Sequence, residues 1–314
     1  MEKNWHHKKK IVEERNTIKM LYSSLIFGLT NVALLATFSD ATKPGLPNIV
    51  FVLGDDQGQY AVGYNNPEII SPNLNDLAAT GIILDQHYTY QYCSPTRTSL
   101  LTGRWPFKAA GTKDNIALTD IDGVDLGFTF LPQRLKEAGY ATHHVGKWHL
   151  GFADFRYTPT ARGFDTSDGF FSGDQYHFNQ TDSTSGPCPN HPITSEIFVN
   201  GVVDKSLQGI HDTYRFNNTA IRIINEHAAK YGLNDVPLYL YLAFNSPHSP
   251  IEVDEEYYNL YPQIDYPLQR TFYGMVTEVD YAVGDIVKAL KNTGLWENTL
   301  FIYAGDNGSP VSPT

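Results

Sequence analysis

Two pairs of oxygen-bearing side chains come directly after apolar runs, near opposite ends of the sequence. Asp55 and Asp56 follow the run at 48–54, and Asp306 and Asn307 follow a later one. Adjacent carboxylates repel each other, and a hard cation such as Ca²⁺ or Mg²⁺ relieves that repulsion by binding their oxygens. An isolated Asp-Asp pair is more often a solvated loop or a helix cap. Two such pairs at one edge of a sheet would together make a four-oxygen metal site.

A thiol and a guanidinium stand four residues apart in Cys93-Ser-Pro-Thr-Arg97, where the sequence predicts the start of a helix. The positive end of a helix favours a thiolate, and the planar fork of Arg97 suits an oxyanion. Nucleophilic chemistry of the cysteine-protease kind is therefore one interpretation of Cys93. A lone cysteine is also commonly a buried core residue, and spacing alone does not separate the two interpretations.

Basic side chains follow two further apolar runs. Lys147 and His149 come after one predicted strand, and His248 comes after another. In α/β proteins ligands bind beyond the carboxyl ends of the parallel strands, so we expect these side chains beside the carboxylates. A histidine near a strand is often only a hydrogen-bonded core residue, and we keep that interpretation for His143 and His144.

The elements that must position these residues alternate along the chain. Strands are predicted over 48–54, 140–146, 238–244 and 299–304, and helices over 71–81, 129–138, 214–230 and 269–291. This alternation predicts an α/β fold with a largely parallel sheet flanked by helices. Residues 172–212, rich in Gly, Pro, Ser and Asp, are expected to form a long irregular excursion.

Composition limits the class of protein. The chain has 314 residues, of which 41% are hydrophobic and 18% charged, with a formal net charge of −11. A charged fraction below the roughly 25% of ordinary globular proteins excludes a disordered or fibrous chain. The acidic balance argues against nucleic acid as a partner, because phosphate binding needs a basic surface. Two cysteines, Cys93 and Cys188, allow one disulfide at most, and no pattern predicts an oligomeric state.

The first 40 residues are predicted to be a targeting segment. Lysines and one arginine within residues 1–20 precede an apolar run at 21–38, the layout of a cleaved secretory signal peptide. A signal anchor is the alternative, because the run approaches the ~20 residues that span a bilayer. Entry into the secretory pathway agrees with glycosylation sequons at Asn179 and Asn217, which we expect on surface loops.

Two longer motifs resemble the signatures of the type I sulfatases. Cys93-Ser-Pro-Thr-Arg-Thr-Ser-Leu-Leu-Thr-Gly-Arg104 resembles their Cys-x-Pro-x-Arg motif with its following Thr-Gly-Arg, and Gly139-Tyr-Ala-Thr-His-His-Val-Gly-Lys-Trp-His-Leu-Gly151 resembles the second signature. The resemblance runs from about residue 47 to the end of the chain. Within the family, Pro159-Thr-Ala-Arg-Gly-Phe-Asp165 and Asn245-Ser-Pro-His-Ser-Pro250 are most similar to arylsulfatase B-like, or N-acetylgalactosamine-4-sulfatase-like, enzymes.

The resemblance implies a role for each of these positions. Cys93 would be oxidised by a formylglycine-generating enzyme to formylglycine, an aldehyde whose hydrate is the nucleophile. Arg97 and His149 would hold and activate the hydrate, while Lys147 and His248 would contact the sulfate, with His248 near the leaving oxygen. The Ca²⁺ ligands would be the modified Cys93 together with Asp55, Asp56, Asp306 and Asn307.

The resemblance also implies an overall fold and activity. The expected fold is an alkaline-phosphatase-like sandwich with a large, mixed, mainly parallel central sheet, and residues 46–314 would be an N-terminal sulfatase catalytic domain, truncated and without its C-terminal part. The expected reaction is hydrolysis of sulfate esters, on sulfated small molecules or on saccharides such as glycosaminoglycans, in the lysosome or extracellular space. Two alternatives stay open: a phosphonate or phosphate ester hydrolase of the same superfamily, and a truncated chain without activity.

Overall fold

The computed structural model describes residues 45–109, 115–117, 120–182, 196–233 and 235–309. The predicted signal segment at 1–40 and Cys188 lie outside these residues. Within the described part of the chain, no helix is long and apolar enough to cross a membrane.

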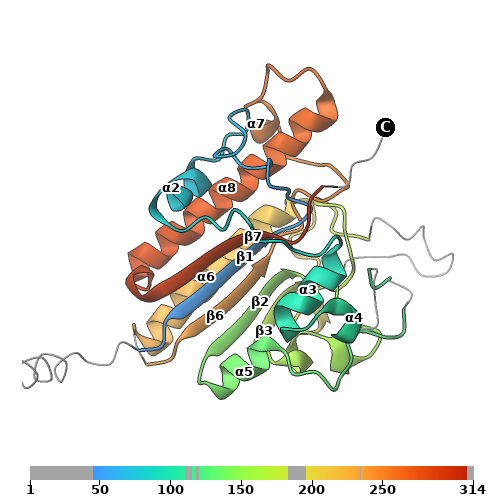
Figure 1. Ribbon diagram of the computed structural model, residues 1–314, viewed down its shortest axis with the longest axis vertical. Helices are drawn as coiled ribbons and strands as arrows, with labels where there is room; N and C mark the ends of the chain where they lie inside the picture. The colour runs from blue at the N-terminus through green and yellow to red at the C-terminus, as the bar shows by residue number, and fades with distance from the viewer. Residues whose placement is uncertain (1–44, 110–114, 118–119, 183–195, 234, 310–314) are drawn as a thin grey trace, which may run out of the picture. The chain divides into compact units, whose positions relative to one another are not determined.

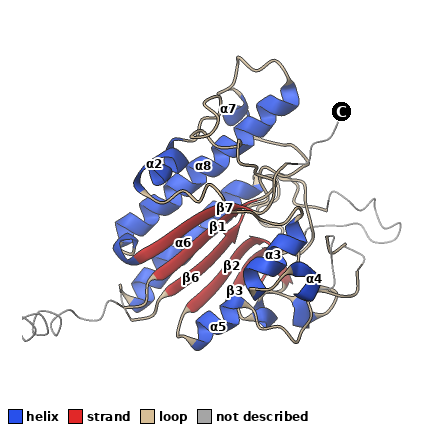
Figure 2. Ribbon diagram, viewed as in Figure 1, coloured by secondary structure: helices blue, strands red, loops and turns tan. Residues whose placement is uncertain are grey.

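A seven-stranded sheet forms the centre of the described fold, with the strand order β5-β4-β3-β2-β6-β1-β7 (Figure 2). The five strands from β3 to β7 in this order run parallel, and β4 and β5 add an antiparallel edge. The strands are β1 Asn48–Gly54, β2 Ala141–Lys147, β3 Thr166–Phe170, β4 Ile197–Val199, β5 Val202–Val203, β6 Leu238–Ala243 and β7 Thr299–Gly305. The expectation of a mixed, mainly parallel sheet is confirmed.

Helices cover both faces of this sheet (Figure 1). One face packs against α6 and α8, with α2 beside α8, and the other packs against α3 and the region of α5. The helices are α2 Pro72–Thr80, α3 Cys93–Thr102, α4 Pro106–Ala109, α5 Leu131–Glu137, α6 Asp212–Tyr231, α7 Glu255–Tyr258 and α8 Pro267–Thr293, with 3₁₀ turns at Phe155–Tyr157, Thr160–Arg162 and Trp296–Asn298. Because both faces are covered, β1 and β6 are continuous apolar runs rather than alternating ones.

Alternate residues of the central strands enter two separate cores. In β6, Leu240 and Leu242 join the core under α6 and α8, whereas Tyr239 and Tyr241 join the core on the α3 face. Burying one large side chain contributes about 1.5–3 kcal/mol, so these two cores fix the sheet in place.

The longest helix shows how local sequence sets an element. α8 begins with Pro267 at its first turn and ends at Gly294, whose φ of +77° is the left-handed conformation of a helix C-cap. Between these ends, buried residues recur at helical spacing, as at Val276, Val279 and Val283. That stripe is the amphipathic pattern expected of a helix packed on a sheet.

The predicted strands and helices are present with boundaries shifted by two residues or fewer, and three details differ. The strand β3 was not predicted, because Thr-Ser-Asp-Gly-Phe lacks an apolar run; it forms by pairing with β2. The expected irregular excursion at 172–212 contains the short strands β4 and β5. The helix α3 already begins at Cys93, ahead of the proline that was expected near its first turn.

Candidate active site

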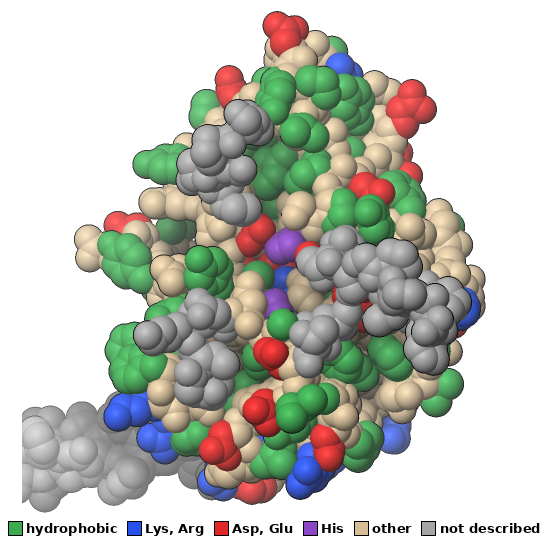
Figure 3. Space-filling model, turned by 90° about the vertical axis from the view of Figure 1, so that its right-hand side faces the viewer, with side chains coloured by type: hydrophobic (Ala, Val, Ile, Leu, Met, Phe, Trp, Pro, Cys, Tyr) green, Lys and Arg blue, Asp and Glu red, His purple; other side chains and the backbone are tan. Residues whose placement is uncertain are grey.

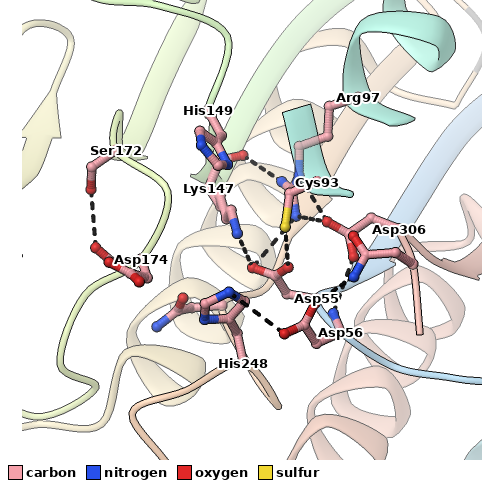
Figure 4. Close-up of polar contacts among 12 residues, drawn as sticks. Asp55, Asp56, Cys93, Arg97, Lys147, His149, Ser172, Asp174, His248 and Asp306 are labelled. Carbon is pink, nitrogen blue, oxygen red and sulfur yellow. Dashed lines mark hydrogen bonds and ion pairs between the residues drawn. The ribbon is translucent and has the colours of Figure 1, made fainter. Parts of the chain in front are cut away.

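The side chains singled out by the sequence meet at the carboxyl edge of the sheet (Figure 4). The space-filling view in Figure 3 shows acidic, basic and histidine side chains gathered in a hollow of this face. Four neighbouring strands and one helix start supply the residues, which are Asp55 and Asp56 after β1, Lys147 at the end of β2 with His149 beyond it, His248 after β6, Asp306 and Asn307 after β7, and Cys93 at the start of α3.

The two pairs of oxygen-bearing side chains, from distant parts of the sequence, are in direct contact. The backbone N–H of Asp56 donates to Oδ1 of Asp306 at 3.1 Å, and the amide nitrogen of Asn307 donates to Oδ1 of Asp56. Oxygens of Asp55 and Asp56, Sγ of Cys93 and a ring nitrogen of His248 all lie within 4.8 Å of one another. The register of the parallel pair β1–β7, in which Gly54 lies opposite Gly305, places both pairs at the same level.

The donor set of this cluster fits a hard cation. The side-chain oxygen of Asn307 is buried and has no hydrogen-bond partner among the described residues, so an acceptor is left for an ion. Burial, followed by the negative charge of Asp55, raises the pKa of Asp306. Burial acts in the same direction on Asp55, but Lys147, His248 and Arg97 outweigh it and hold the pKa of Asp55 below its usual value. A divalent cation would relieve the remaining repulsion between these carboxylates.

Two fully buried cations neutralise part of this negative charge. Arg97 donates through Nε and Nη2 to Oδ2 of Asp306, at 3.1 and 2.8 Å, and through Nη1 to the carbonyl of Lys147 at 3.0 Å. The ammonium of Lys147 lies 2.5 Å from Oδ2 of Asp55. Buried charges are retained only when paired in this way, so this cluster is a site prepared for charge rather than part of the core.

Cys93 lies within this cluster but is a poor thiolate. Its side chain is buried, and its thiol donates to Oδ1 of Asp55 at 3.3 Å. Burial and then the charge of Asp55 raise the pKa of the Cys93 thiol far above its usual value. These effects outweigh the field at the start of α3, so protease-like thiolate chemistry is not favoured.

His149 presents a free acceptor nitrogen. Its Nε2 lies 3.0 Å from the carbonyl of Ile116, and because a carbonyl only accepts, Nε2 carries the proton. Its Nδ1 is buried with no partner among the described residues. Burial, then the charges of Lys147 and Arg97, lower the pKa of His149 well below its usual value, so the ring is neutral at pH 7. A neutral imidazole with a bare nitrogen can accept a hydrogen bond from a hydroxyl group.

Two residues of the site have a strained backbone. Asp56 and His149 have φ values of +56° and +58°, a left-handed conformation that costs a side-chain-bearing residue roughly 1–2 kcal/mol. Gly173 lies against the ring of His149, where a Cβ would be only 2.8 Å from Cε1. Such strain persists at functional sites because the surrounding structure fixes the geometry that the chemistry needs.

His248 lies at the outer side of the cluster. Its side chain is 16% exposed, and Nε2 lies 3.6 Å from Oδ2 of Asp56. Its Nδ1 donates to the carbonyl of Ser249 at 2.6 Å, which leaves Nε2 as the nitrogen that faces the site. Sequence reasoning missed the polar groups near it, which are His177 in contact with the His248 carbonyl, Asp212 in contact with His177, and the pair Ser172 and Asp174. They come from or border the segment at 172–212, whose mixed composition carries no signal for a site.

Comparison of the sequence with protein-family models identifies the family of this chain. The Sulfatase model matches residues 47–314. The chain belongs to the sulfatase family. Among curated proteins, the chain is 36% identical over 264 residues to mouse arylsulfatase J, covering 83% of this chain and 42% of the relative. It is 32% identical to arylsulfatase G of Rattus norvegicus over 313 residues, covering 93% of this chain and 56% of the relative.

These relatives leave the finer subgroup open. The mouse N-acetylgalactosamine-6-sulfatase is 29% identical over 302 residues, covering 91% of this chain and 54% of the relative. The chain therefore spans about half the length of the curated sulfatases it matches. The expected closeness to the arylsulfatase B-like subgroup is not supported by these comparisons.

Solved structures show the same fold. Ps i-CgsB in complex with k-i-k-neocarrahexaose superposes with a TM-score of 0.76 at 31% identity, covering 85% of this chain and 59% of that one. The sulfatase sandwich inferred from the two signatures, with its alkaline-phosphatase-like central sheet, is thereby confirmed for the described residues.

Proposed function

We propose that the site hydrolyses sulfate esters. The observation that carries this proposal is its charge. Asp55, Asp56 and Asp306 bring three formal negative charges, and Arg97 and Lys147 bring two positive ones. A divalent cation added to this set leaves one net positive charge, which matches the single negative charge of a sulfate ester. The dianion of a phosphate monoester would leave an excess negative charge in a buried site, which is costly.

One group of residues would hold the metal ion and supply the nucleophile. Ca²⁺ would be held by Asp55, Asp56, Asp306, Asn307 and the modified side chain at position 93, and when bound it would polarise the sulfate. A formylglycine hydrate at position 93 would supply one hydroxyl to attack sulfur and a second whose deprotonation expels the sulfate afterwards. A plain serine has no such second hydroxyl and could not complete the cycle.

The remaining side chains bind the sulfate and move protons. Arg97 and Lys147 offer fixed donors to the oxygens of the sulfate. The bare Nδ1 of His149 can accept a hydrogen bond from the hydrate and orient its hydroxyl group. When both ring nitrogens of His248 are protonated, Nδ1 donates to the carbonyl of Ser249 and Nε2, on the outer side of the cluster, can donate a proton to the departing alcohol oxygen. General acid catalysis of this kind accelerates a reaction by about 10²–10⁴-fold.

The substrate class that we propose is a sulfated saccharide, including glycosaminoglycans. It is supported by relatives named N-acetylgalactosamine-6-sulfatase and by a structural neighbour whose complex contains k-i-k-neocarrahexaose. Arylsulfatases J and G among the relatives support the breaking of sulfate esters in general, and small aryl sulfates serve as probes.

We also propose passage through the secretory pathway to the lysosome or the extracellular space, where a formylglycine-generating enzyme meets the chain during synthesis. Asn179 is exposed on a loop, and its Oδ1 accepts from the hydroxyl of Thr181 at 2.6 Å, so this sequon is open to glycosylation. Asn217 does not lie on a surface loop as expected. It is buried in α6, where its amide donates to Asp285 at 3.3 Å, and a glycan would require that contact to break.

The test begins with the chain made in a secretory host that contains the modifying enzyme. We expect the peptide that carries Cys93 to have the mass of formylglycine, and the protein to turn over an aryl sulfate faster than the matched aryl phosphate in the presence of Ca²⁺. Mass spectrometry of the tryptic peptide and phenol release measure the two outcomes.

Cys93→Ala is the matched control, because it removes the nucleophile and leaves the carboxylates in place. It should lose turnover on both esters. A preference for the phosphate ester, or an unmodified thiol in a fully active protein, would refute the proposal.

A further inference from the structure

The loop that carries His248 is held from behind by a buried polar cluster. The carbonyl oxygen of His248 lies 3.1 Å from Nε2 of His177, and because a carbonyl only accepts, this nitrogen donates the proton. At the start of the same loop, the amide nitrogen of Asn245 donates to Oδ2 of Asp212 at 2.9 Å. The loop is thus tied at its start and at His248 itself to side chains that do not belong to the catalytic cluster.

Asp212 joins these two ties. It is the first residue of α6 and is fully buried. Its Oδ1 lies 2.8 Å from Nδ1 of His177, while its Oδ2 accepts from Asn245 and, at 3.0 Å, from the amide of Gln175. One carboxylate therefore fixes both the ring that contacts the His248 carbonyl and the residue at which the loop begins.

A second histidine keeps this arrangement rigid. The ring of His211 stacks on that of His177, with centroids 4.8 Å apart and planes inclined by 2°. His211 lies 2.9 Å from Oε1 of Glu278, and its Nε2 lies 3.1 Å from the carbonyl of Glu252. The cluster is a poor metal site, because an ion must lie near the plane of each imidazole it binds and two stacked parallel rings offer no shared plane.

The other side of the loop faces the proposed metal site. The carbonyl of Ser246 accepts from the backbone N–H of Asp55 at 3.2 Å, and the hydroxyl of Ser246 lies 2.8 Å from that of Thr213 in α6. A shift of this loop would therefore move Nε2 of His248 relative to Asp55 and Asp56. Misplacing a reacting group by about 1 Å can cost on the order of 10²-fold in rate.

We propose that His177 and Asp212 are positioning residues, which hold the backbone of His248 so that Nε2 points at the departing oxygen of the substrate. This inference rests on the proposed function for the catalytic role of His248, but the hydrogen-bonded support that it describes does not. The two parts can therefore be tested separately.

Two variants of His177 separate its contacts. In His177→Asn the side-chain amide reaches the place of Nδ1 and keeps a partner for Asp212, but the bond to the His248 carbonyl is lost. In His177→Gln the amide reaches the place of Nε2 and can still donate to that carbonyl. The control is His227→Asn, because His227 is also a buried histidine whose Nε2 lies near a carbonyl, that of Val236 at 2.9 Å, but it belongs to the far part of α6.

The first readout is turnover of a series of substituted phenyl sulfates whose phenols span a range of pKa. In His177→Asn, kcat should fall by about tenfold or more for the poorest leaving group and much less for the best, because only poor leaving groups need the proton from His248. His177→Gln should recover most of that loss. A uniform loss along the series, or the same profile in His227→Asn, would overturn the proposal.

The second readout needs no turnover. In protein labelled with ¹³C at histidine Cε1, the NMR signal of His248 is assigned by its absence in His248→Gln. It should shift in His177→Asn and stay in place in His227→Asn. If the wild type hydrolyses no sulfate ester and the signal shifts, the proposed function fails and the support of His248 stands. An unshifted signal overturns the positioning role.

Discussion

Arg97 on α3 contacts three other sequence segments of the site. Its guanidinium contacts Asp306, the carbonyl of Lys147 and, at 3.7 Å, Oδ2 of Asp55. A lysine could not replace it, because an ammonium lacks the planar fork that reaches two acceptors at fixed angles. Arg97 and Lys147 together offset two of the three carboxylates, which leaves one negative charge that a bound cation would balance.

At the residue scale, the carboxylate of Asp306 is expected to set the affinity for the metal. We predict that Ca²⁺ raises the Tm of the wild type and that Asp306→Asn loses most of this rise, because the variant removes one negative charge and one of the two carboxylate oxygens. Binding to the folded state alone adds about 2.7 kcal/mol of stability at a concentration 100 times Kd. Differential scanning calorimetry with and without the ion measures the effect.

Glu137→Gln is the control, since Glu137 is an exposed partner of Arg134 on α5. Its Ca²⁺-dependent rise in Tm should equal that of the wild type. A larger rise with Mg²⁺ than with Ca²⁺ would contradict the calcium assignment.

At the scale of elements, the approach of β2 to β6 places Lys147 and His149. Gly146 has a φ of +95°, and a Cβ at this position would lie 1.9 Å from the carbonyl oxygen of Ala243. Only glycine allows the two strands to come this close immediately before the residues that enter the site. The backbone of the sheet edge thereby determines the position of the ammonium that contacts Asp55.

We predict that Gly146→Ala lowers the free energy of unfolding by about 3 kcal/mol or more, because it adds a collision with a strand backbone to the strain of a positive φ. Gly139→Ala separates the two effects. Gly139 has a similar φ of +93°, but no atom lies within 4 Å of the place of its Cβ. That variant should lose only about 1–2 kcal/mol. Urea unfolding measures both, and equal losses would show that the close approach is unimportant.

At the scale of the whole molecule, buried histidines in opposite charge states should govern the response to pH. Burial alone would lower the pKa of His211, but Glu278 and then Asp212 raise it to about 9. Burial lowers the pKa of His144 to about 3, where the ring packs among aromatic side chains. His211 is therefore charged and His144 neutral in the native protein at pH 7.

The direction in which each histidine changes the free energy of unfolding with pH follows from the direction of its pKa shift. Since the pKa of His211 is raised in the folded state, its contribution is complete below about pH 6.5 and is lost as the pH rises towards 9. We predict a loss of up to about 3 kcal/mol in the free energy of unfolding over this interval, from a shift of roughly 2.5 pH units. In His211→Gln this loss between about pH 6.5 and 9 should be much smaller. Urea unfolding at several pH values measures it.

The matched control is His227→Gln. Its free energy of unfolding should fall at alkaline pH as steeply as that of the wild type, because the pKa of His227 is lowered and not raised. If the free energy of unfolding of His211→Gln falls with alkaline pH as steeply as that of the wild type, the charged state of His211 is contradicted. On the acidic side, stability should fall below about pH 6.5, since protonation of His144 in the unfolded chain alone favours unfolding.

The sequence by itself determined which residues carry the chemistry and the order of the elements that hold them. Apolar runs, glycine stops and proline starts are local patterns, so they predicted β1, β2, β6 and β7 and the polar residues that follow each strand. The two signatures around Cys93 and His149 indicated the family for the same reason, because each is contiguous in the chain.

Only the tertiary structure decided which polar residues touch. The register of β1 against β7 brings Asp56 to Asp306 across 250 residues of sequence, and no local pattern encodes that register. Likewise, nothing in the segment at 172–212 indicated that His177 would lie behind His248, because hydrogen bonds between distant side chains leave no spacing in the sequence. Cys93 and Asn217 are both buried, and burial raises the pKa of the Cys93 thiol. Burial results from packing, which depends on the whole fold.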